Sequence, residues 1–119
     1  MARPSNPHSV RFYPAQEDFL VTGNEKSFAI MYDEVLQVSR IELHKLMKKK
    51  GFKLSEDDIS DTVYGTAAII MARYRKGMYI IRNLSTMCLF GVKTVLWSHK
   101  QKCFEEQVES LSGENRYID

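Results

Sequence analysis

The chain has 119 residues, of which 44% are hydrophobic, so one domain with a modest core is expected. The net charge of +2 is too small to indicate a class of partner by itself. No run of about 18 apolar residues occurs, which excludes a membrane-spanning helix, and the first residues, MARPSNPHSVRFYP, lack the apolar region of a secretory signal.

Residues 1–25 contain all three prolines of the chain and several turn-forming residues. Proline lacks the N–H that helices and strands use, so we expect this segment to form an extended N-terminal arm. Arg3 and Arg11 make the arm basic. Terminal segments of this kind become ordered when a partner ties them down.

A helix is expected from about residue 26 to residue 50, because Phe28, Met31, Val35 and Val38 repeat at steps of three and four. The sequence KKKG, residues 48–51, suits its end. The three lysines match the negative end of the helix dipole, and Gly51 suits the left-handed position that follows. Capping is the first interpretation of these lysines, and a phosphate contact is the alternative.

The sequence LSEDDISD, residues 54–61, predicts the start of a second helix with Ser55 as its N-cap. An inward stripe is expected at Ile59, Val63, Ala67, Ile70 and Tyr74. The other side carries small and acidic residues, which another helix could approach closely: Asp58, Asp61, Gly65, Ala68 and Ala72. Glycine in a helix interior costs about 1 kcal/mol relative to alanine, so we expect a packing role for Gly65.

The last helix is expected from about Leu84 to Leu111, and its large residues divide between two faces. The core stripe contains Leu84, Cys88, Val92, Val95, Leu96 and Cys103. Phe90, Trp97 and Phe104 lie on the opposite face among Thr86, Lys93, Thr94, Lys100 and Gln101. This second face either packs against another part of the chain or binds a partner.

Charge is segregated along the chain. No Asp or Glu occurs in residues 62–104, and the cations there are Arg73, Arg75, Lys76, Arg82, Lys93, Lys100 and Lys102. A basic segment is typical of polyanion binding, although a solvated helix face is an equal alternative on charge alone. Aromatic rings beside lysines suit single-stranded nucleic acid, because bases stack on the rings while lysine pairs with phosphates.

These patterns together predict an all-α fold, a compact three- to four-helix domain over residues 26–112, followed by a polar C-terminal tail over residues 113–119. We expect no enzyme, no cofactor and no metal site, since no catalytic motif is present and His8, His44 and His99 lie in separate segments. Cys88 and Cys103 are about four turns apart on one predicted helix and cannot pair, which favours a reduced, cytoplasmic setting.

Residues 57–103 resemble conserved region 2 of bacterial sigma factors. The family's D-L-x-Q-E-G block corresponds to DISDTVYG at residues 58–65, and its basic-aromatic turn corresponds to RYRKG at residues 73–77. The promoter-reading helix, F-S-T-Y-A-x-x-W-I-R-x-A-I, is similar to LSTMCLFGVKTVL at residues 84–96. YIIRNLST at residues 79–86 also resembles the corresponding helix of extracytoplasmic-function sigmas.

The resemblance implies a sigma region 2 fold and two binding surfaces. The first would bind the clamp coiled coil of the largest subunit of core RNA polymerase through Asp58, Asp61, Thr62, Gly65 and Ala68. The second would bind promoter DNA, mainly single-stranded, by capturing bases of an AT-rich minus-ten-type element as it melts. Its residues would be Met87, Phe90, Lys93, Thr94 and Trp97, with Lys100 and Lys102 along the backbone.

The chain departs from the family at several positions. Met87 stands where the family has Tyr, and Gly91 replaces one member of its aromatic pair. No region 4 helix-turn-helix follows, so the chain resembles the reduced late-transcription sigma factors of T-even-type phages, acting in the host cytoplasm, with a further phage protein as a candidate partner. ENRYID at residues 114–119 is a poor version of their clamp-docking tail. The alternative is a small helical structural or adaptor protein, such as a virion component or transcription regulator, that has a sigma-like fold and no promoter recognition.

Overall fold

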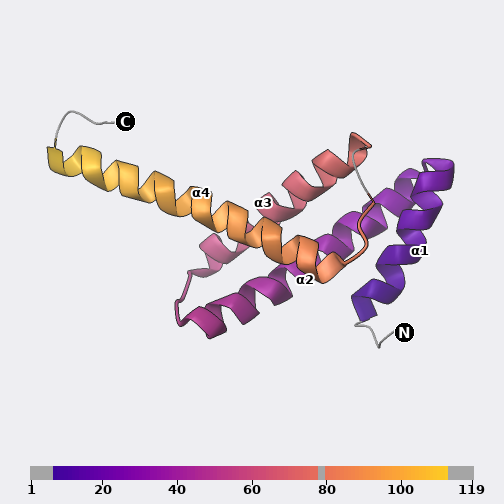
Figure 1. Ribbon diagram of the computed structural model, residues 1–119, viewed down its shortest axis with the longest axis horizontal. Coiled ribbons are helices and arrows are strands. Elements are labelled where there is room, and N and C mark those ends of the chain that lie inside the picture. Colours follow the sequence, from indigo (N-terminus) through magenta and orange to yellow (C-terminus); the bar gives the residue numbers. More distant parts are fainter. Residues whose placement is uncertain (1–6, 78–79, 113–119) are drawn as a thin grey trace.

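The computed structural model describes the backbone of residues 7–77 and 80–112 and the side chains of residues 10–77 and 80–98. Four helices follow one another: α1 (Pro7–Thr22), α2 (Glu25–Lys50), α3 (Glu56–Arg75) and α4 (Leu84–Ser112) (Figure 1). Within the described ranges there is no strand. The predicted all-α, compact domain is therefore confirmed, with four helices.

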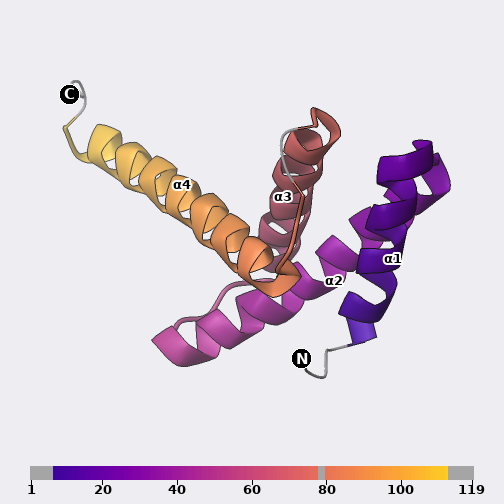
Figure 2. The same cartoon turned by 45° about the vertical axis from the view of Figure 1, so that its right-hand side comes forward.

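The extended N-terminal arm is wrong for residues 7–22, which form α1 and pack on α2 (Figure 2). Pro7 is the first residue of α1, where the missing N–H has no helical partner to lose. Pro14 lies inside the helix and would disfavour it by about 3 kcal/mol. The complete burial of Phe12, with Ala15 and Gln16 beside it, outweighs that local preference.

The ends of α2 and α3 follow from local capping. Asn24 caps α2, with its side chain accepting from the Lys26 amide, and Gly51 ends it at a φ of 74° with its N–H donated to Met47. Ser55 is the N-cap of α3 as predicted, since its hydroxyl accepts from the Asp58 amide at 3.1 Å. Each cap satisfies backbone groups that the helix itself leaves without partners.

The core has two neighbouring parts. The larger joins all four helices, with α1 and α2 contributing Phe12, Met31 and Val35. The smaller lies between the second half of α2, the start of α3 and the middle of α4, where Leu43, Ile59, Val63 and Val92 meet. All five residues of the inward stripe predicted for α3 are buried.

Helix α4 lies across α2 and α3 and then extends beyond them, as the two views show (Figures 1 and 2). Its predicted inward stripe is confirmed at Leu84, Cys88 and Val92, which are buried. The packed half of α4 thus fixes the orientation of the whole helix, including the part that projects. Val95 and Leu96, also predicted for this stripe, are only half-buried, and Cys103 lies outside the described side chains.

Candidate nucleic-acid interface

The start of α4 is held by Asn83. Its side-chain oxygen accepts from the Thr86 amide at 3.0 Å, and its carbonyl accepts from the Met87 amide at 3.0 Å. Leu84 and Cys88 then point into the core, so the opposite side of α4 faces away from the other helices. We call this the outward face; its exposed residues are Thr86, Phe90, Lys93, Thr94 and Trp97.

Two large aromatic side chains stand on the outward face without cover. Phe90 is 59% exposed and Trp97 is 63% exposed. They are seven residues apart, which places them on one side of the helix and about 10 Å apart along its axis. Lys93 is exposed between them. The outward face therefore combines two aromatic planes with a cation.

The other residues predicted to bind DNA differ in their placement. Thr94 is exposed, and its hydroxyl donates to the Phe90 carbonyl at 2.9 Å, which leaves its oxygen lone pairs for a partner. Met87 is half-buried and packs against the core at the edge of the outward face. Lys100 and Lys102 lie in the second half of α4, and their side chains are outside the described residues.

Gly91 lies where α4 packs closely against α3. A Cβ atom on Gly91 would lie 2.7 Å from Cγ2 of Thr66 and 3.1 Å from Cδ1 of Ile70. These distances are well below the 3.5–4.0 Å or so that carbon atoms prefer. A side chain at this position would therefore force Thr66 or Ile70 of α3 to shift.

Only some of the residues predicted to bind polymerase are exposed. Asp61 and Ala68 are exposed, and Asp58 is half-buried at the helix start. Thr62 is only 5% exposed, with its hydroxyl donated to the Asp58 carbonyl at 2.7 Å. Gly65 faces α4, because a Cβ atom there would lie 3.6 Å from Cγ1 of Val95. The helix that approaches α3 at Gly65 is thus α4 of the same chain.

The free side of α3 contains a residue that the sequence reasoning missed. Tyr64 is 56% exposed, three residues after Asp61 and four before Ala68. Its spacing from these two residues was the available signal, since residues three and four apart share a helix face. Together the free side of α3 presents Asp57, Asp61, Tyr64, Ala68 and Ala72.

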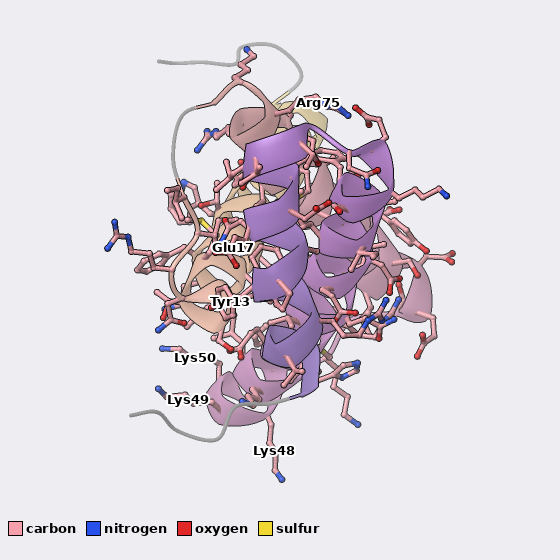
Figure 3. The ribbon with its side chains drawn as sticks, turned by 90° about the vertical axis from the view of Figure 1, so that its right-hand side faces the viewer. Tyr13, Glu17, Lys48, Lys49, Lys50 and Arg75 are labelled. Atoms are coloured by element: carbon pink, nitrogen blue, oxygen red, sulfur yellow. The ribbon has the colours of Figure 1, made fainter. Side chains whose placement is uncertain are left out.

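The basic segment is only partly available to a polyanion. Arg73, Lys76 and Arg82 are exposed near the connection between α3 and α4. Arg75 is already engaged, since both of its terminal nitrogens bond the carboxylate of Glu25, and its guanidinium lies 4.1 Å from the ring centre of Phe28. It ties the end of α3 to the start of α2, opposite the Lys48–Lys50 end of α2 (Figure 3).

Three further observations concern metal binding, membrane spans and the free thiol among the residues that the structure describes. There, no group of three or more His, Cys, Asp or Glu side chains is placed to hold a metal ion. Among the same residues, no helix is both long and apolar enough to cross a membrane. Burial raises the pKa of the Cys88 thiol to about 11, so this cysteine remains protonated at neutral pH.

Comparisons with known proteins give no family for the chain. No protein-family model, no curated protein and no solved structure matches it.

Proposed function

We propose that the chain is a minimal sigma-like transcription factor, with a fold related to sigma region 2. It would bind core RNA polymerase and recognise an AT-rich minus-ten-type promoter element as the DNA melts. The observation that carries the proposal is the exposure of Phe90 and Trp97 on the outward face of α4, with Lys93 between them.

Aromatic exposure of this kind suits single-stranded nucleic acid. In a duplex, bases show only their edges, whereas in a melted strand their faces can stack on Phe90 and Trp97. Stacking contributes about 1–3 kcal/mol per base, and Lys93 would add a phosphate contact. The rings are about 10 Å apart, whereas nucleotides of a stacked strand are about 3.4 Å apart. The two rings would therefore take bases about three steps apart and leave room between them for the backbone.

The free side of α3 supplies the proposed polymerase surface. Asp57 and Asp61 give it negative charge, and Ala68 and Ala72 keep it shallow enough for a partner helix. Tyr64 would be the aromatic anchor of this surface, a role in which tyrosine is enriched. Thr62 and Gly65 would instead support the surface from below, since one is buried and the other faces α4.

The alternative function is a helical structural or adaptor protein without promoter recognition. That proposal would have Phe90 and Trp97 covered by protein. They are exposed within this chain, so the cover would have to come from a second protein. The two proposals therefore differ in what binds the outward face, a nucleic-acid strand or a protein surface.

Binding of a fluorescently labelled AT-rich single strand, followed by anisotropy, tests the proposal. Phe90→Ala should raise the Kd roughly 5- to 150-fold, which corresponds to the loss of one stacked base. Tyr64→Ala is the matched control, because it removes an aromatic ring of similar exposure from α3. Equal affinities for the wild-type chain and Phe90→Ala would contradict the proposal.

A further inference from the structure

Two polar side chains of helix α1 hydrogen-bond the backbone of the α3–α4 connection. The Gln16 amide donates to the Ile81 carbonyl at 3.0 Å and accepts from the Ile81 N–H at 2.9 Å. The Tyr13 hydroxyl donates to the Arg82 carbonyl at 3.0 Å and accepts from the Leu84 N–H at 2.9 Å. Tyr13 lies on the flank of α1 beside this connection (Figure 3).

The backbone of the α3–α4 connection thus finds its hydrogen-bond partners in side chains of α1 and not in the backbone of a neighbouring strand or helix. A glutamine side chain carries the same donor and acceptor as a peptide group, so Gln16 pairs with Ile81 as a neighbouring backbone would. Gln16 is 5% exposed, and Ile81 and Leu84 are each 1% exposed. Both Gln16–Ile81 bonds are buried, so water cannot easily replace Gln16, and its loss would leave the Ile81 backbone groups without their partners. The Tyr13–Leu84 bond is partly buried, whereas the Tyr13–Arg82 bond is exposed to water.

The backbone groups that Gln16 and Tyr13 bind lie directly before α4 and at its first residue. Leu84, bound through its N–H, is the first residue of the helix, and Phe90 follows it by fewer than two turns. Trp97 lies two turns further on, beyond Val92, which is anchored in the core. Fraying of the start of α4 would therefore displace Phe90 and leave Trp97 in place.

We infer that Gln16 and Tyr13 are positioning residues for the nucleic-acid face. They fix the start of α4 so that Phe90 is presented to a base, although neither residue belongs to the outward face. The inference rests on the proposed function, and it assigns α1 a part in recognition that a mere cover for the core would not have.

Two substitutions remove the hydrogen bonds between α1 and the α3–α4 connection and keep the side chains close to their original size. Gln16→Met preserves the length of the side chain without its hydrogen bonds, and Tyr13→Phe removes only the hydroxyl. Amide hydrogen exchange at Ile81 and Leu84 should become roughly two- to tenfold faster for each bond lost. Ser55→Ala is the control, since it removes one side-chain bond to a backbone amide at the distant start of α3. Unchanged exchange at Ile81 and Leu84 would overturn the inference.

Binding of the labelled single strand supplies the second readout, in a double-mutant cycle. Gln16→Met should weaken binding several-fold in the wild-type chain and in Trp97→Ala, but not in Phe90→Ala, because the effect passes through Phe90. A purely structural role predicts the same weakening in all three backgrounds, and that result would overturn the inference. Failure of the wild-type chain to bind the strand would refute the proposed function, and the exchange result would still show whether α1 holds the start of α4.

Discussion

At the crossing of α3 and α4, replacement of two glycines by alanine should change the stability of the fold in opposite directions. Gly91→Ala would place a Cβ atom 2.7 Å from Cγ2 of Thr66. Thr66 cannot turn away freely, because it is completely buried and its hydroxyl donates to the Thr62 carbonyl at 2.7 Å. Overpacking of this kind costs about 1–3 kcal/mol, against a gain of about 1 kcal/mol in helix propensity. We expect a net loss of up to about 2 kcal/mol.

Gly65→Ala differs because the new methyl group finds room. Its Cβ would lie 3.6 Å and 3.9 Å from the two methyl carbons of Val95, which are ordinary contact distances. The gain in helix propensity then remains, so this variant should be as stable as the wild-type chain or up to about 1 kcal/mol more stable. Comparison of Gly91→Ala with Gly65→Ala thus distinguishes the cost of a close contact between helices from the gain in helix propensity.

Urea denaturation followed by circular dichroism measures both variants. The midpoint should fall for Gly91→Ala and hold or rise for Gly65→Ala, with similar slopes against urea concentration. Destabilisation of both variants by the same amount would show that the two helices cross elsewhere. A stabilised Gly91→Ala would refute the reasoning outright, since no close contact with Thr66 could then exist.

Three further predictions concern single side chains. Trp97 is the chain's one tryptophan, so its emission should be red-shifted in the free protein, and single-stranded DNA should quench it; a blue-shifted spectrum would contradict the exposed outward face. Lys93→Gln should lower the slope of log Kd against log salt by about 0.7, the value for one phosphate of a single strand, and an unchanged slope would exclude that contact. Because burial raises the pKa of Cys88 to about 11, the folded thiol keeps its proton between pH 9 and 11 while the unfolded one loses it. Stability should therefore decline over that window in the wild-type chain more steeply than in Cys88→Ala, and parallel profiles would contradict the burial of the thiol.

Helices α2, α3 and α4 could be predicted closely because their signals are local. The expected helix of residues 26–50 became Glu25–Lys50, and the expected last helix of residues 84–111 became Leu84–Ser112. Ser55 and Gly51 act where the chain itself ends each helix, so no tertiary information was needed.

Helix α1 could not be predicted in the same way, because its stability comes from contacts distant in sequence. Phe12 is buried by the other helices, and Gln16 pairs with a backbone 65 residues away. Pro14 provided the strongest local signal, and it pointed away from a helix. Tertiary burial overrode that preference.

The candidate site, too, was predictable where it depends on helical periodicity and not where it depends on the packing of distant helices. The outward face of α4 followed from the helical period, so Phe90 and Trp97 were placed together correctly. On α3, period alone could not show which neighbour would cover Thr62 and Gly65. That depends on the crossing with α4, which the glycines make possible and which leaves Tyr64 exposed instead.

Capture of core RNA polymerase on the tagged protein tests the central claim most directly. The wild-type chain should retain polymerase, and Asp61→Arg/Ala68→Arg should lose it, because both substitutions alter exposed positions on the free side of α3. Glu17→Arg is the matched control, since it makes the same reversal of charge as Asp61→Arg at an exposed position of α1 (Figure 3). Retention by the wild-type chain and the control, with loss in the α3 variant, is the result we expect. No capture by a folded wild-type chain would contradict the sigma-like function.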